Sequence, residues 1–294
     1  MSVETKKILV PVGFSEQSLI ALDEACILAS AMGSEIVLLS VIEDNDLITR
    51  VFGSDESRNS EKVKEQIQSR LLLLAEEKFR ETGIKISTML AHGTIYEEIA
   101  RVAELIDASL VVMGTNGRPS NFKKRLIGSN AYRTVGNTKI PVITTRGIRR
   151  LRGLKNIIFP LVLDRRSKEK VGMALYFSRL FNSKITVVAV PKKADDVLIL
   201  QKHLNQVVNF INERGVLVEG HILEPKAGKS IEEFLDFAYN QDGDLIMQME
   251  ENESVDIASN LLGSDMQEVI YHSEVPVMSL TPKHQRYESL FQNW

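Results

Sequence analysis

The chain carries one pattern of residues twice, and this repeat limits the folds that it can adopt. Four segments of the second half match segments of the first: Ile157–Val162 with Ile8–Gly13, Asn182–Ile185 with Gly33–Ile36, Leu262–Ser264 with Ile127–Ser129, and Pro276–Val277 with Pro141–Val142. The first two pairs are offset by 149 residues and the last two by 135. The difference of 14 predicts a longer connection between the second and third strands of the first half, in the polar stretch Glu43–Ser60. With 294 residues, the chain suits two copies of one domain.

Each copy alternates between strand and helix patterns. In the first half, the apolar run Ile8–Val12 and the strand pattern Glu35–Ile42 flank a helical pattern at Ser18–Met32 that Gly33 ends. The alternation continues with helices expected at Glu61–Thr82, Ile95–Ile106 and Gly128–Asn137, and with strands expected at Ile84–Ala91, at Val111–Met113 and at Ile140–Thr145. This order predicts an α/β fold with a doubly wound parallel sheet and helices on both faces. Ligands of such sheets bind beyond the carboxyl ends of the strands.

Composition and charge exclude several classes of function. The net charge of −3 argues against nucleic acid as a partner. No apolar run approaches the roughly 20 residues of a membrane span, and Met1–Lys7 carries no apolar leader, so we expect a cytoplasmic protein without membrane contact. The single cysteine, Cys26, excludes an intrachain disulfide and lies in a helical pattern that predicts a core position.

The stretch Val111–Asn130 has the layout of an anion site. An apolar strand ends at Gly114, a second glycine follows at Gly117, and Gly128-Ser129 can begin another helix. Glycines after a strand let the backbone approach a ligand, and free N–H groups at a helix start point toward a negative group. Phosphate is the candidate ligand. The three cations Lys123–Arg125 between the glycines could screen it or could simply be solvated.

No catalytic constellation is legible, and we expect no enzyme with efficient turnover. Gly228-Lys229-Ser230 resembles the end of a P-loop, but Leu223 stands where that pattern needs a glycine. The five histidines show no metal-binding spacing. The segment Gly114–Asn130 contains no Asp or Glu that could hold a metal ion beside phosphates. We therefore predict no catalytic residues and no metal site.

Together, these motifs resemble the universal stress protein family, and the duplication resembles its tandem members. The likeness rests on four segments: Ile8–Val12, His92-Gly93, Gly114–Ser129 and Ile140–Val142. It implies two parallel five-stranded sheets of the adenine nucleotide alpha-hydrolase-like type with flavodoxin-like layering. The last strands, Ile140–Thr145 and Val275–Leu280, would meet in an intrachain pseudo-dimer. The expected domains are residues 1–146 and 155–282, joined by a basic linker at 147–154 and followed by a tail at 283–294.

The resemblance also implies an adenine nucleotide, ATP or AMP with or without Mg²⁺, bound to the first domain only. It places five residues around the phosphates: Gly114, Gly117, Gly128, Ser129 and Asn130. It places four around the adenine and ribose: Val12, Gly13, Val41 and Met113. Two features depart from the family pattern. Ten residues separate Gly117 from Gly128 where the family has nine, and Gly13 replaces an aspartate that contributes to base and ribose recognition.

The second half departs further, and we expect it to bind no nucleotide. Met249, Asn252 and Val162 occupy the positions of Gly114, Gly117 and Gly13. A methionine side chain would block the approach of a phosphate to the backbone. Because Gly263-Ser264 persists in this half, part of the role of the Gly-Ser pair is structural, as a turn and helix cap.

Two functions remain open at this stage. In the first, nucleotide occupancy orders the segment Arg118–Ile127 and changes a surface that an unknown protein partner reads. In the second, the chain is an interaction scaffold without nucleotide, as Gly13 and the extra loop residue would favour. The tail supplies a candidate surface, since Tyr287, Leu290, Phe291 and Trp294 would share one face of a helix, and docking on its own domain is the alternative. Further pairing of chains stays open.

Overall fold

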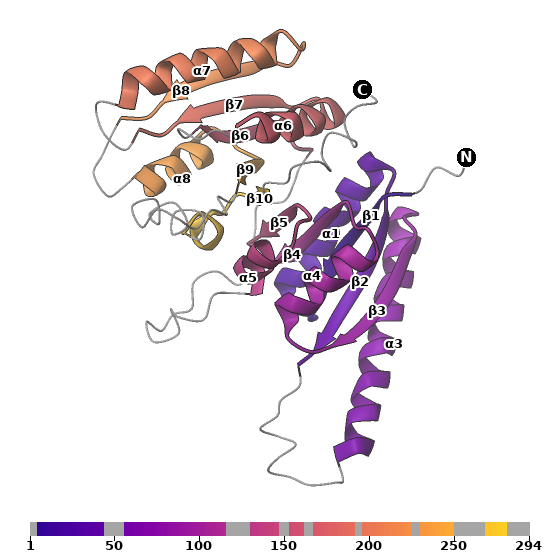
Figure 1. Ribbon diagram of the computed structural model, residues 1–294. Coiled ribbons are helices and arrows are strands. Elements are labelled where there is room, and N and C mark those ends of the chain that lie inside the picture. Colours follow the sequence, from indigo (N-terminus) through magenta and orange to yellow (C-terminus); the bar gives the residue numbers. More distant parts are fainter. Residues whose placement is uncertain are drawn as a thin grey trace.

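The computed structural model describes residues 5–43, 56–115, 130–146, 153–161, 167–191, 196–224, 230–249 and 268–280. Within this part of the chain, ten strands form one sheet in the order β3-β2-β1-β4-β5-β10-β9-β6-β7-β8 (Figure 1). The strands of the first half are β1 (Lys7–Pro11), β2 (Glu35–Ile42), β3 (Ile86–His92), β4 (Leu110–Gly114) and β5 (Val142–Thr145). Those of the second half are β6 (Asn156–Leu161), β7 (Lys184–Ala189), β8 (Val218–Ile222), β9 (Leu245–Met249) and β10 (Val277–Leu280).

Helices cover both faces of the sheet, as the alternation of patterns predicts. One face carries α1 (Glu16–Met32), α3 (Glu56–Thr82), α6 (Ser167–Phe181) and α7 (Asp196–Asn212); the other carries α4 (Ile95–Leu105), α5 (Asn130–Asn137) and α8 (Ser230–Asn240). Each face has one apolar core that runs through both halves: Leu22 of α1 and Phe177 of α6 belong to the first core, and Ile99 of α4 and Phe234 of α8 to the second. The expected α/β fold is confirmed.

The two halves meet where β5 and β10 pair, as the resemblance implied. All neighbouring strands within each half run parallel, whereas β5 and β10 run antiparallel. Ile143 pairs with Met278, its own equivalent at the offset of 135. On either side of this pair, Thr144 pairs with Val277, the equivalent of Val142, and Val142 pairs with Ser279, the equivalent of Thr144. A pseudo-twofold axis therefore passes through the pair Ile143–Met278 and turns two five-stranded sheets into one.

The strand register corrects the estimate of the extra length in the first half. Ile36 pairs with Ile86, whereas its equivalent Ile185 pairs with Val218. Ile86 and Val218 are thus equivalent and are 132 residues apart, whereas Ile36 and Ile185 are 149 apart. The first half therefore has 17 extra residues between its second and third strands. The second half has three more before α8, which leaves the net difference of 14.

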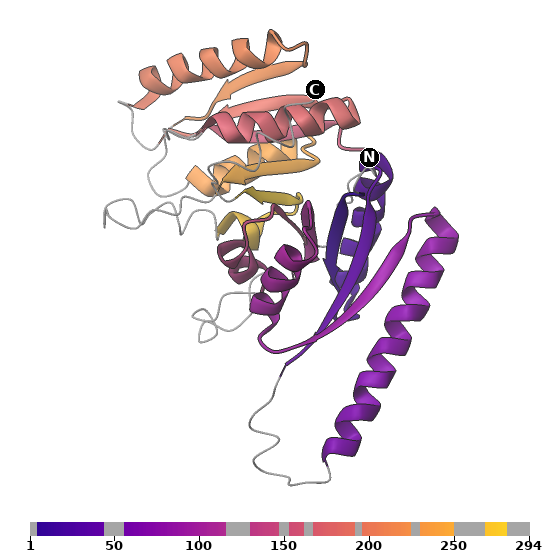
Figure 2. The same cartoon turned by 45° about the vertical axis from the view of Figure 1, so that its right-hand side comes forward.

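Part of this extra length is helix, where the sequence predicted only loop before Glu61. Helix α3 has 27 residues and α7 has 17. As Figure 2 shows, α3 extends beyond the strands that it covers. Other boundaries differ from the prediction by one or two residues; for example, α1 begins at Glu16, β3 spans Ile86–His92 and β5 begins at Val142. The tail lies outside the described residues.

Candidate functional site

The carboxyl ends of β1 and β4 form the candidate site. In the order β3-β2-β1-β4-β5, the chain moves outward from β1 in one direction and then from β4 in the other, so this pair is the topological switch point. Loops on opposite faces diverge there and leave room for a ligand. Gly13 follows β1 and Gly114 ends β4, which places both predicted glycines at this point.

Gly114 is required by the packing of α1. A Cβ atom at this position would lie 2.4 Å from the carbonyl oxygen of Gln17, in the first turn of α1, and 2.5 Å from its carbonyl carbon. No side chain fits so close to another backbone. The sequence predicted a glycine here for the approach of a phosphate, whereas the structure gives a reason within the protein itself.

Gly13 has the opposite surroundings. A Cβ atom there would have no neighbour within 4 Å, and the residue is exposed. The next residue, Phe14, has a φ of 57°, which is the left-handed region that a residue with a Cβ rarely adopts. Ser15 then caps α1 by accepting a hydrogen bond from the Ser18 N–H at 3.3 Å. The turn from β1 to α1 is thus open at Gly13 and held by the cap that follows.

The three apolar residues expected around the base lie on different faces of the sheet. Val12 belongs to the core under α1 and α3, whereas Met113 belongs to the core under α4 and α5, against which Val41 packs. Val12 and Met113 are only 2% and 4% exposed. A ligand could contact both Val12 and Met113 only beyond the carboxyl ends of the strands. Val41, which is half-buried, is therefore the best placed of the three residues for contact with a ligand.

The remaining predicted phosphate residues fall mostly outside the described part of the chain. Gly117, Gly128 and Ser129 lie there, as do the cations Lys123–Arg125. Asn130 is the first described residue of α5 and is exposed. The assignment of these residues to a ligand stays a prediction.

Sequence inspection missed the hydroxyl residues beside Gly114. Thr145 pairs with Gly114 in the β4–β5 register, and its carbonyl accepts the Thr115 N–H at 2.8 Å. Thr145 is 1% exposed, and its equivalent in the second half is Leu280. The repeat itself contained this signal, because a comparison of the last strands shows a hydroxyl in one copy and an apolar residue in the other.

In the second half, a methionine stands at the strand end that corresponds to Gly114. Met249 ends β9, is half-buried and packs against the apolar core on the α6 and α7 face. Its side chain occupies the strand end where Gly114 stands in the first half. The expectation that the second half binds no nucleotide stays a prediction, and Val162 and Asn252 are outside the described residues.

Candidate groups for catalysis are few in the described ranges. They contain no cluster of three or more His, Cys, Asp or Glu residues that could hold a metal ion. Burial raises the pKa of the Cys26 thiol to about 11, so this group stays protonated and unreactive at neutral pH. Glu98, in the first turn of α4, accepts hydrogen bonds from Arg101, which lower the pKa of its carboxyl group. Its charge is already paired.

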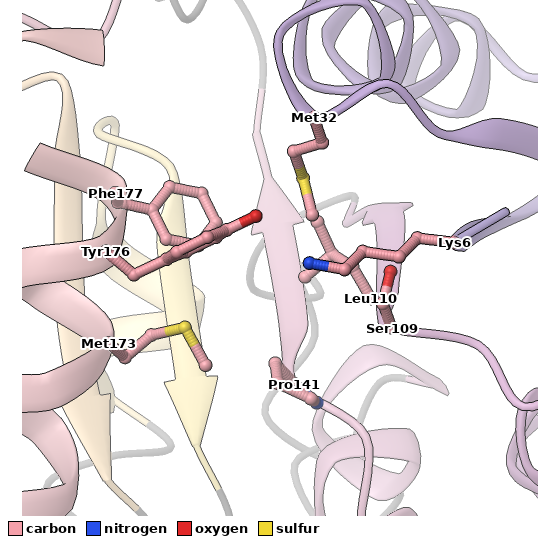
Figure 3. Close-up of a pocket in the computed structure, with 8 residues that line it drawn as sticks. All are labelled: Lys6, Met32, Ser109, Leu110, Pro141, Met173, Tyr176 and Phe177. Atoms are coloured by element: carbon pink, nitrogen blue, oxygen red, sulfur yellow. The ribbon is translucent and has the colours of Figure 1, made fainter. Parts of the chain in front are cut away.

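A small cavity lies between the two halves, at the amino ends of the strands (Figure 3). Lys6 and Ser109, which precede β1 and β4, face Met173 and Tyr176 of α6 across it. The Lys6 ammonium lies 5.3 Å from the centre of the Tyr176 ring. The volume of about 30 Å³ suits a water molecule and is far below the roughly 300 Å³ of a pocket for a drug-sized ligand. Because it lies at the amino ends of the strands, this cavity is separate from the candidate nucleotide site at their carboxyl ends.

Comparisons with known proteins agree with this architecture. A model of the universal stress protein family matches residues 4–146. The chain is 30% identical to the universal stress protein MJ0531 of Methanocaldococcus jannaschii, over 48% of this chain and 82% of that protein. It is 32% identical to the universal stress protein YxiE of Bacillus subtilis, over 48% of this chain and 98% of that protein. The chain belongs to the universal stress protein family.

The fold of the whole chain also has a counterpart among solved structures. A universal stress protein from Archaeoglobus fulgidus superposes with a TM-score of 0.77, at 21% identity, over 95% of this chain and 97% of that one. The likeness extends across both halves, so the overall fold of the chain is shared with that protein. No helix in the described ranges is long and apolar enough to span a membrane.

Proposed function

We propose that this universal stress protein binds an adenine nucleotide, ATP or AMP, in its first half and that occupancy acts as a signal to a protein partner. The second half serves as the structural mate that covers the edge of β5. The protein acts without efficient turnover of the nucleotide. The cytoplasmic location and the optional Mg²⁺ ion expected from the sequence belong to this proposal.

The geometry of the switch point carries the proposal. Gly13 leaves open space at the end of β1, and Gly114 presents only backbone at the end of β4. In the second half, the half-buried Met249 takes the place of Gly114. The strand end thus carries no side chain in the first half, whereas in the second half it carries one that packs on the core. A binding site in the first half alone is consistent with this difference.

Calorimetric titration of the purified protein with ATP and AMP tests the proposal, together with chromatography of nucleotide released on denaturation. Gly117→Val should abolish binding, because a branched side chain would stand where the backbone meets a phosphate. Asn252→Val is the matched control, since it changes the equivalent position of the second half. We expect it to bind as the parent does. A folded parent that binds neither nucleotide and releases none would refute the proposal.

A scaffold without nucleotide is the second candidate, and one surface favours it. Leu72, Leu73 and Phe79 of α3 are 48%, 63% and 53% exposed. Exposed apolar side chains on one helix are typical of surfaces that contact other proteins. The titration separates the two functions, because a scaffold predicts no heat of binding with either nucleotide. Loss of partner capture on changing Leu72 and Phe79 to Ser would then support the scaffold.

A further inference from the structure

Two arginines lie over aromatic rings toward the carboxyl ends of the strands in the first half, one on each face of the sheet. The guanidinium carbon of Arg70, on α3, lies 4.3 Å from the centre of the Phe14 ring, in the turn that follows β1 and Gly13. That of Arg133, on α5, lies 5.1 Å from the centre of the Tyr96 ring, at the start of α4. Both rings follow the carboxyl ends of strands, β1 and β3 respectively. The two cations therefore lie on opposite faces of the sheet, each beside a ring that follows the carboxyl end of a strand.

Neither arginine has an anionic partner among the described residues. No described carboxylate forms an ion pair with either guanidinium, in contrast to Arg101, which is paired with Glu98 at 2.7 Å. A guanidinium stacked on a ring keeps its planar fork of donors in one orientation. Within the part of the chain that the structure describes, these two side chains thus present positive charge that no carboxylate neutralises.

The repeat shows that one of these pairs is specific to the first half. At the offset of 135, Glu268 takes the place of Arg133, and Ile231 takes the place of Tyr96. Glu268 is bonded to His272 at 2.7 Å within the second half. The first half therefore has an arginine over an aromatic ring at these positions, whereas the second half has a glutamate and an isoleucine.

We propose that Arg70 and Arg133 bind the phosphate groups of the nucleotide from opposite faces of the sheet. This inference rests on the proposed function, which it extends by naming two residues that no family motif contains. A planar guanidinium recognises phosphate oxygens through two parallel hydrogen bonds. The ligand then lies across the ends of β1 and β4, with its charge between the two rings. Affinity comes in part from these arginines, so ligands that carry more phosphate bind more tightly.

Titration of three ligands against single variants tests this assignment. Arg70→Gln and Arg133→Gln should each weaken ATP binding about tenfold, which is the loss of one charge-assisted contact, and should change adenosine binding by less than about twofold. Inorganic triphosphate should compete with ATP for the parent, and more weakly for either variant. Arg70→Lys should retain part of the ATP affinity, because the charge remains while the planar fork is lost.

The second half offers a matched control. Arg214 lies over Phe210 at 3.3 Å from the ring centre, just after α7 and far along the sheet from the site. Arg214→Gln removes the same kind of stacked cation and should leave ATP affinity unchanged. Parent-like ATP binding by either Arg70→Gln or Arg133→Gln overturns the proposal, as does an equal loss for ATP and adenosine, which would indicate contact with the base. A parent that binds no nucleotide refutes the proposed function, and this inference with it.

Discussion

At the scale of single residues, Gly114 and Gly13 form a natural pair for experiment. Gly114→Ala would place a methyl group 2.4 Å from the Gln17 carbonyl oxygen, in a strand packed against α1. Because backbone cannot rotate away as a side chain can, either α1 or β4 must shift. Overpacking of this kind typically lowers the free energy of unfolding by about 1 to 3 kcal/mol. Urea denaturation followed by circular dichroism measures this loss.

Gly13→Ala is the control for that substitution. The new methyl group would meet nothing within 4 Å, and the backbone of Gly13 does not need a positive φ. We expect a change within about 0.5 kcal/mol of the parent. Equal stability of the two variants would show that α1 does not dictate a glycine at the end of β4, and would leave ligand approach as its remaining explanation.

The requirement for a glycine at Gly114 was visible in the sequence, but its structural cause was not. A glycine after an apolar strand marks a close approach of some group, and only the tertiary packing shows that Gln17 of α1 is that group. The same holds for Arg70 and Arg133. Their rings, Phe14 and Tyr96, are 56 and 37 residues away in the chain, so no local pattern connects them.

At the scale of elements, the pair of strands β5 and β10 joins the two halves of the sheet. Ile143 and Met278 face each other on the pseudo-twofold axis, and both are fully buried. Ile143→Ala and Met278→Ala should each lower the free energy of unfolding by about 2 to 5 kcal/mol, because each removes apolar contacts from the core that spans both halves. The double variant should depart from additivity by about 0.5 to 3 kcal/mol, since the two side chains are cross-strand neighbours.

A second double variant gives the reference for this coupling. Val187 is fully buried in β7, and β10, β9 and β6 separate that strand from β5. Strand spacing puts it roughly 20 Å from Ile143. The effects of Ile143→Ala and Val187→Ala should therefore add within about 0.5 kcal/mol. Additive behaviour of Ile143 and Met278 as well would contradict direct packing across the axis.

Strand and helix types followed from periodicity, whereas lengths and registers did not. The apolar runs of β1, β2 and β4 are buried on both faces, so their assignment needed no knowledge of neighbours. The start of α3 was missed because Glu56–Ser60 is polar throughout, and polar residues form helix and loop alike. The offset of 132 between β3 and β8 could not be seen in the sequence. The matching segments of the repeat lie before and after these strands, so they show only the offsets of 149 and 135.

At the scale of the whole molecule, each half completes the other by covering one strand edge. The outer edge of β5 meets β10, and the described ends of the sheet are β3 and β8. A half on its own would expose β5, with buried residues such as Val142 and Ile143, as a free edge. Free apolar edges pair readily with other strands. Because the two halves belong to one chain, the pairing of β5 with β10 is intramolecular. The same pairing between separate chains would depend on protein concentration.

We expect residues 1–146, expressed alone, to form a homodimer through β5. The pair Ile143–Met278 relates equivalent positions of the repeat, so two copies of the first half can meet in the same antiparallel register, with Ile143 opposite Ile143. Sedimentation equilibrium over a range of concentrations should show a dimer, and its melting temperature should rise with concentration because folding and pairing are linked. The dimer should keep the switch point at β1 and β4, and hence any nucleotide binding of the parent. A folded monomer at all concentrations would show that the first half is complete without a strand beside β5.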